Sequence, residues 1–142
     1  MKLPLHFKAQ SQSKAGIQKT WSLASYGHQA PCAVPAEFGG PGGGFSPEDL
    51  FAQALTNCFI ATFKVYAENS KLTFSDIQID TNLTVAMNDT KKVTMQSCHF
   101  DIHLHQTPQT EKAELLIKKA FDSGFILNSV KTALTYELHM HD

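Results

Sequence analysis

Three cysteines and seven histidines are the side chains of this chain with the clearest potential for nucleophilic or metal chemistry. Cys58 lies in the middle of a strongly apolar stretch, residues 45–71. A thiol in such a place is either a small core side chain or a nucleophile, since free cysteine is often buried. A nucleophile would have to be a thiolate, and Cys58 lies some three turns inside the expected helix, beyond the reach of the N-terminal dipole. It would therefore need a nearby cation or hydrogen-bond donor.

The cysteine spacing argues against two common uses of cysteine. Cys32, Cys58 and Cys98 are an odd number, are widely spaced and contain no CxxC pair, which argues against a disulfide framework and a structural zinc site. The start of the chain has no apolar run typical of a secretory signal, and no stretch has membrane-spanning length. We therefore expect a cytoplasmic protein with reduced thiols, without metal or cofactor.

The histidines alternate with apolar residues along two expected strands. His103 and His105 share one face, and His139 and His141 share a face of another strand, so neighbouring strands could bring four imidazoles together. Both pairs fall on the polar side of the alternation, where solvated residues lie in any case. We therefore expect these histidines to face solvent.

Composition narrows the class of partner. The 142 residues are 42% hydrophobic and 18% charged, with a net charge of -1, which is typical of one soluble domain over residues 1–142. This charge gives no electrostatic case for nucleic acid or an anionic membrane. All 12 basic residues are lysine, so the chain has no arginine, whose planar guanidinium can donate two parallel hydrogen bonds to one partner. The expected partner is a small molecule or another copy of the chain.

One long helix must position Cys58. Its predicted start has Ser46 as N-cap, Pro47 in the first turn and Glu48 and Asp49 after it, and its predicted end is near residues 69–71. Apolar side chains wrap most of its surface, which predicts burial on most sides. A chain of this size has few other helices to cover it, so we expect a partner subunit.

The remaining elements surround this helix. Residues 3–10 and 17–25 predict an N-terminal hairpin that turns near residues 13–16, and the glycine-rich and proline-rich stretch 26–47 predicts a loop. From Asp76 onward the apolar residues recur at every second position, which predicts a strand. We expect one face of this strand to carry Ile77, Ile79, Leu83, Val85 and Met87.

A second strand beyond Met95 has Cys98, Phe100, Ile102 and Leu104 as its predicted inner face. A second helix is expected from about Thr110 to Phe121, with Ala113, Leu116, Ile117 and Ala120 as its stripe. The segment 124–131 is ambiguous and compatible with a short helix, and a last strand alternates from Leu134 to Met140. The order β-β-α-β-β-α-β predicts an α+β fold.

The stretch FGGPGGGFSPEDLFAQALTNCF, residues 38–59, resembles the OsmC/Ohr family. The family signature is a glycine-containing loop, then S/N-P-E-[ED]-L, then an apolar helix with a cysteine ten residues after the glutamate. Glu48 and Cys58 have this spacing. The resemblance extends over most of the chain, through the later strands and the second helix, and PEDL…NCF is its specific part.

The resemblance implies a fold and a chemistry. It implies an intertwined homodimer, with the two long helices packed at its centre and a curved antiparallel sheet from each subunit around them. It also implies thiol-dependent reduction of organic hydroperoxides, in which the oxidised cysteine is captured by a second, resolving cysteine. An apolar pocket would suit alkyl hydroperoxides better than hydrogen peroxide.

Two departures from the family pattern affect this chemistry. Gly124, in SGFILNS, stands where the resolving cysteine would be, and the active-site arginine is missing. Lys14 matches the arginine position, and Lys19 is the other candidate, although both also fit as solvated lysines. Glu48 lies about 15 Å from Cys58 along a straight helix, so a cation would have to link them.

The other cysteines offer alternative resolving thiols. Cys98 faces inward on its strand, and Cys32 lies in a loop that we expect to be mobile. A disulfide needs Cα atoms within about 7 Å. A one-cysteine cycle with an external thiol is the simpler possibility.

The sequence therefore predicts a thiol peroxidase site of Cys58, Glu48 and Lys14, in a homodimer that uses organic hydroperoxides and an external thiol reductant. The alternative is non-catalytic binding of a small apolar ligand, or thiol-based sensing, on the same fold. A purely structural dimer is the third possibility.

Overall fold

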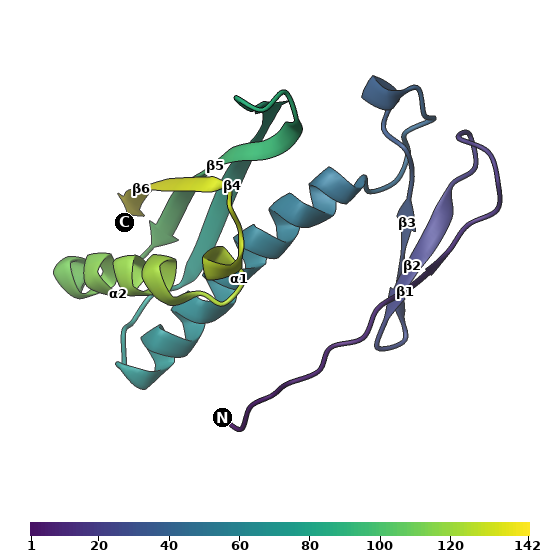
Figure 1. The fold of residues 1–142 in the computed structure, drawn as a ribbon. Helices are drawn as coiled ribbons and strands as arrows, with labels where there is room; N and C mark the ends of the chain where they lie inside the picture. Colours follow the sequence, from purple (N-terminus) through teal and green to yellow (C-terminus); the bar gives the residue numbers. More distant parts are fainter. The chain divides into compact units, whose positions relative to one another are not determined.

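The computed structural model describes residues 1–142, which group into two compact units, residues 1–51 and 52–142 (Figure 1). Each unit has its own three-stranded sheet, with orders β1-β2-β3 and β4-β5-β6. The α+β class is confirmed. The prediction of one domain over the whole chain stays a prediction.

The first sheet contains the predicted N-terminal hairpin, with a much shorter first strand. β1 (Gln10–Gln12) pairs antiparallel with β2 (Trp21–Ser25), and the chain turns between them as expected. Residues 3–9 are not part of a strand, and Leu3, Leu5 and Phe7 are exposed. No strand of this unit pairs with residues 3–9, and their apolar alternation alone does not hold an extended segment in a sheet.

A second hairpin replaces part of the predicted loop 26–47. β2 continues into β3 (His28–Cys32) through Tyr26 and Gly27, whose φ angles are 52° and 79°. Two central residues with positive φ make a tight turn whose twist suits antiparallel strands. The sequence prediction missed this strand because Pro31 indicates a loop. Proline is tolerated here because β3 is an edge strand.

The glycine-rich segment after β3 is a loop, as predicted, and it folds tightly on itself. It contains the short 3-10 helix η1 (Ala36–Phe38), and the amide of Gly42 donates to the carbonyl of Val34 at 3.2 Å. A Cβ on Gly40 would lie 2.0 Å from the Val34 carbonyl oxygen. Gly40 is therefore required by the close approach of two backbone segments.

We predict that Gly40→Ala destabilises the protein by about 3 kcal/mol, because the added methyl overlaps backbone that cannot move away. Gly43 is the matched control: its φ is 81°, but a Cβ there would meet nothing within 4 Å. Gly43→Ala should cost only the conformational strain, about 1 kcal/mol. Urea unfolding of both variants measures the difference, and equal losses would refute the role given to Gly40.

Helix α1 (Pro47–Asn69) begins as predicted. The Ser46 hydroxyl accepts a hydrogen bond from the Asp49 amide at 3.0 Å, and the Asp49 carboxylate accepts one from the Ser46 amide at 2.9 Å. This reciprocal cap satisfies two amides at the start of the helix.

Within one chain α1 buries a single stripe of side chains, and Val65 on another side is 58% exposed. The buried stripe consists of Leu55, Thr56, Phe59, Phe63 and Ala67. The predicted burial on most sides is not reached in a single chain.

The second sheet is mixed, whereas a wholly antiparallel sheet was expected. β4 (Asp76–Met87) pairs antiparallel with β5 (Val93–His105), but β6 (Ala133–His141) runs parallel to β5. The crossover between β5 and β6 contains α2 (Thr110–Ser123) and the short 3-10 helix η2 (Leu127–Ser129). A parallel pair needs such a crossover connection, and α2 supplies it.

The core of this second unit lies between its sheet and its helices, which cover one face of the sheet (Figure 1). The predicted inner face of β5 and the predicted stripe of α2 are both buried, which confirms them. Phe59 of α1 packs its ring 5.4 Å from that of Phe100 and 5.9 Å from those of Phe121 and Tyr136.

The end of β4 departs from the predicted alternation. Val85 and Met87 are exposed, and the β4-β5 register shifts between Thr84 and Val85. A bulge disturbs the alternation that sequence periodicity assumes.

None of the helices has the length and apolarity that crossing a bilayer requires.

Candidate active site

Helix α1 places Cys58 at the border of its buried stripe. The next residue, Phe59, is fully buried, the preceding Asn57 is exposed, and Cys58 is half-buried between them. Within residues 52–142, Thr62 is the one hydrogen-bond partner of the sulfur, with its Oγ1 at 4.0 Å from Sγ. The half-buried thiol is accessible to a small molecule, and no lysine of this unit donates a hydrogen bond to the sulfur, as a stabilised thiolate would need.

The turn after α2 lies directly against the Cys58 sulfur. Gly124 ends the helix, with its amide donating to the Ala120 carbonyl at 3.0 Å. A Cβ built on Gly124 would lie 3.0 Å from Cys58 Sγ and 2.9 Å from Leu127 Cδ1. The position where the family resemblance places a resolving cysteine is thus in contact with Cys58, and this chain has no side chain there.

Cys98 is poorly suited to act as the second thiol. It is fully buried on the inner face of β5, as predicted. Burial raises the pKa of its thiol to about 11, so little of it is thiolate near neutral pH.

Cys32 does not lie in a mobile loop, which corrects the sequence prediction. It is the last residue of β3, is 3% exposed and pairs in register with Trp21. The amide of the adjacent Ala33 donates to the Phe45 carbonyl at 3.1 Å. The proposed travel of Cys32 on a flexible loop therefore has no structural basis.

The other predicted site residues lie in the N-terminal unit. Lys14 is exposed in the turn between β1 and β2. Lys19 precedes β2 and is exposed, with its amide donating to the Gly16 carbonyl, so it is not on the apolar side of the strand. Glu48 is half-buried in the first turn of α1, ten residues before Cys58. The links of Lys14 and Glu48 to Cys58 stay predictions.

Two residues that the sequence prediction did not assign to the site follow Gly124 directly. Phe125 and Ile126 are 66% and 43% exposed, so an apolar surface lies next in the chain to the residue that contacts the thiol. The signal was the run Gly-Phe-Ile-Leu after an amphipathic helix. The sequence pattern of this run is compatible with a short helix, and it does not show by itself that the run lies beside Cys58.

We predict that Cys58 reacts with iodoacetamide well before the other two cysteines. The reason is its partial exposure, whereas Cys32 and Cys98 are buried and the Cys98 pKa is raised. Peptide mass spectrometry after short alkylation times gives the order of labelling. All three should be labelled alike in denaturant, and early labelling of Cys98 in the native protein would contradict the described core.

We also predict that Gly124→Cys forms a disulfide with Cys58 under mild oxidation. A Cβ at 3.0 Å from Sγ has the separation of about 3 Å that a Cβ keeps from the partner sulfur across an S–S bond. Loss of two thiols without reductant, read by intact mass, measures it. Asn128→Cys, an exposed position four residues on, is the control and should stay reduced. Failure of the Gly124→Cys protein to lose its thiols would show that the contact is not kept in solution.

Comparison with known proteins shows which family this chain matches. Residues 40–139 match the family model described as OsmC-like protein. A curated relative, the uncharacterized protein YmaD of Bacillus subtilis (strain 168), is 26% identical over 110 residues, which cover 75% of this chain and 73% of YmaD.

Solved structures share the fold at low sequence identity. An OsmC-like protein of unknown function from Vibrio cholerae superposes with a TM-score of 0.86 at 16% identity, covering 96% of this chain and all of that one. An organic hydroperoxide resistance protein OsmC from Legionella pneumophila gives a TM-score of 0.69 at 20% identity, covering 98% of this chain and all of that one.

Proposed function

This chain belongs to the OsmC-like protein family, and on that premise we propose that it reduces organic hydroperoxides through the thiol of Cys58. The observation that carries the proposal is the half-buried Cys58 sulfur, at the family's cysteine position and against the turn at Gly124. The similarity to the hydroperoxide resistance protein of Legionella pneumophila supports the same activity at the level of the family.

In the oxidative half of the reaction, Cys58 is the only residue that forms a bond with the peroxide. The thiolate attacks the terminal peroxide oxygen, the O–O bond breaks, and the released alkoxide takes up a proton to become an alcohol. Cys58 is left as a sulfenic acid, oxidised by two electrons, while the peroxide is reduced by two.

The reductive half would use external thiols, because this chain offers no suitable second cysteine. Gly124 has no side chain, and Cys32 and Cys98 are buried. One small thiol condenses with the sulfenic acid to give a mixed disulfide and water. A second thiol then attacks that disulfide, which restores Cys58 and releases the disulfide of the small thiol.

Activation of the thiol is proposed to require groups outside residues 52–142. No lysine of that unit donates a hydrogen bond to the sulfur, and we propose Lys14 as the cation and Glu48 as the residue that orients it. An intertwined homodimer would supply such contacts. The exposed apolar residues Leu3, Leu5, Phe7 and Val65 support it, because each would be covered by a partner.

An alkyl hydroperoxide is the proposed substrate, since Phe125 and Ile126 present apolar surface next to Gly124. We predict that stoichiometric cumene hydroperoxide oxidises Cys58 at least about tenfold faster than a free thiol in solution, and faster than hydrogen peroxide does. Intact mass against time, with Cys58→Ser as the unreactive control, measures both rates. Oxidation no faster than that of the free thiol would refute the activity.

A matched pair of variants tests the cation in the same experiment. Lys14→Met should slow the oxidation of Cys58, whereas Lys19→Met should leave it unchanged. The reverse result would transfer the role to Lys19, and no effect in either would remove both lysines from the site.

A second candidate function is binding of a small apolar ligand, or sensing of electrophiles, without turnover. The absence of a side chain at Gly124 and of any arginine favours it, because the usual partners of the cysteine are missing. Rapid oxidation of Cys58 without repeated turnover in excess thiol would indicate a sensor. Saturable ligand binding without oxidation would indicate a binding protein.

A further inference from the structure

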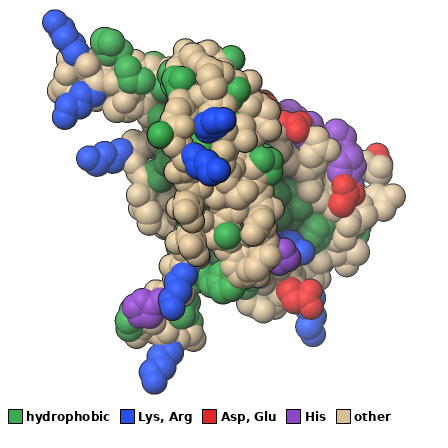
Figure 2. Space-filling view, turned by 90° about the vertical axis from the view of Figure 1, so that its right-hand side faces the viewer, with side chains coloured by type: hydrophobic (Ala, Val, Ile, Leu, Met, Phe, Trp, Pro, Cys, Tyr) green, Lys and Arg blue, Asp and Glu red, His purple; other side chains and the backbone are tan.

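The face of the second sheet that points away from its helices carries an ordered group of histidines and carboxylates. β5 and β6 run parallel and in register, so that Asp101 lies opposite Glu137 and His103 opposite His139. Histidine and acidic side chains lie next to one another on the molecular surface in Figure 2. The strand geometry thus places two pairs of alternate residues, His-x-Asp on β5 and Glu-x-His on β6, side by side.

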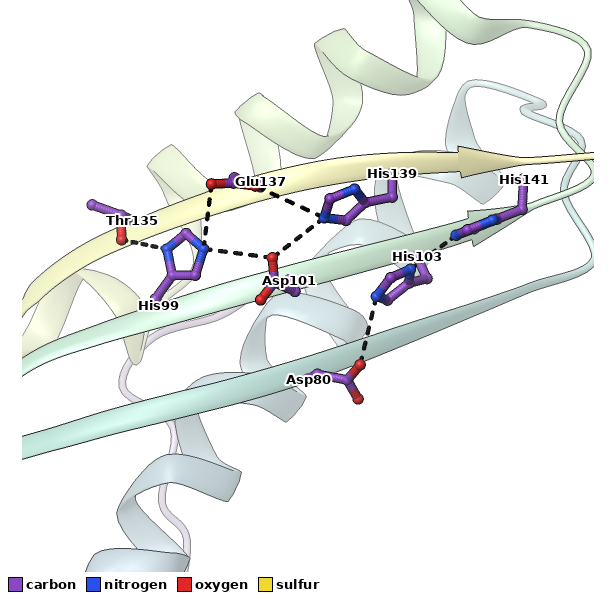
Figure 3. Close-up of polar contacts among 8 residues, drawn as sticks. All are labelled: Asp80, His99, Asp101, His103, Thr135, Glu137, His139 and His141. Carbon is purple, nitrogen blue, oxygen red and sulfur yellow. Dashed lines mark hydrogen bonds and ion pairs between the residues drawn. The ribbon is translucent and has the colours of Figure 1, made fainter.

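Four side chains of this group point toward one another (Figure 3). Asp101 Oδ1 lies 3.6 Å from His99 Nε2 and 3.3 Å from His139 Nε2. The two oxygens of Glu137 lie 4.0 Å from the same two nitrogens. The ligand atoms of His99, Asp101 and Glu137 all lie within 4.8 Å of one another.

These separations are close to those of a tetrahedral metal site. Metal bonds of about 2.0–2.1 Å to nitrogen and oxygen give ligand-to-ligand distances of about 3.3 Å. The distances from Glu137, both 4.0 Å, are longer than this value, so its carboxylate would have to move toward the two imidazoles on binding a metal. Two carboxylates and two neutral imidazoles carry a charge that a divalent cation balances.

Neighbouring residues hold the imidazoles in place. His99 Nδ1 lies 2.7 Å from Thr135 Oγ1. In the tautomer that binds metal, Nδ1–H donates to this hydroxyl and the Nε2 lone pair is free, which is the usual support of a ligating histidine. On the other side, the ring of His103 stacks on His139 with centroids 4.9 Å apart and an interplanar angle of 18°.

We propose that His99, Asp101, Glu137 and His139 bind a divalent transition-metal ion of the zinc class. Imidazole and carboxylate together suit Zn²⁺, and the same donors also accept Ni²⁺ and Cu²⁺. The site is distinct from Cys58, because the helix that carries Cys58 packs on the opposite face of the sheet through Phe59 and Phe100. This proposal revises the expectation that the strand histidines are simply solvated.

The test is titration of the full-length reduced protein with Zn²⁺ by calorimetry, and with Co²⁺ by visible spectroscopy. We expect one ion per chain, with Co²⁺ d–d bands and no thiolate charge-transfer band. His139→Ala and Asp101→Asn should each weaken Zn²⁺ binding by about tenfold or more. His28→Ala, an exposed histidine on β3, is the matched control and should bind Zn²⁺ as the unchanged protein does.

Three outcomes would overturn the proposal. The first is no Zn²⁺ binding at micromolar concentrations, and the second is a thiolate charge-transfer band that Cys58→Ser removes. The third is binding that depends on His103 and His141, whose Nδ1 and Nε2 lie 2.9 Å apart, but not on His99. Circular dichroism of each variant checks the fold. Because the substituted side chains lie on the outer face of the sheet, their replacement should leave the packing of the core unchanged.

Discussion

The packing of Phe59 is the contact on which the C-terminal unit depends. Its ring meets Phe100 of β5 and Tyr136 of β6 edge-on, and it also contacts Phe121 of α2, so one side chain joins two strands and both helices. Leu55 and Phe63, one turn to either side, are fully buried as well and fix the rotation of α1 about its axis. The Cα–Cβ bond of Cys58 is therefore held toward the turn after α2, where Gly124 lies against the sulfur.

The sheet separates two kinds of chemistry. Its inner face is apolar and meets the helix that bears the thiol, while its outer face carries imidazoles and carboxylates in register. Strand alternation produces both faces from one strand, with Cys98, Phe100 and Ile102 of β5 facing in and His99 and Asp101 facing out. The two faces and the borders between them also decide exposure: the Cys98 thiol is fully buried, whereas the Cys58 thiol is half-buried.

Local patterns predicted most elements of the fold, and non-local geometry accounts for most of the errors. The cap at Ser46, the inner face of β5 and the stripe of α2 follow from short-range spacing and are confirmed. The parallel direction of β6 depends on how the α2 crossover returns, which spacing does not encode. The β2-β3 hairpin was missed because the proline and glycine content of residues 26–47 favours a loop, whereas the strand depends on pairing with β2.

For the candidate site, the sequence indicates Cys58 and the glycine at position 124, but only the fold brings the two into contact. Likewise, alternation indicated two rows of histidines. Their convergence with Asp101 and Glu137 depends on the register and direction of β5 and β6, and therefore could not be read from either strand alone.

The contact between Gly124 and Cys58 also determines how much room the sulfur has. Oxidation to the sulfenic acid adds one oxygen atom to Sγ, and formation of a mixed disulfide attaches the whole small thiol to it. At any residue other than glycine, Cβ would stand 3.0 Å from that sulfur, closer than ordinary packing allows. Glycine thus spares the sulfur a contact that every other residue would impose, and a side chain at this position would crowd the oxidised forms of Cys58 even more than the reduced thiol.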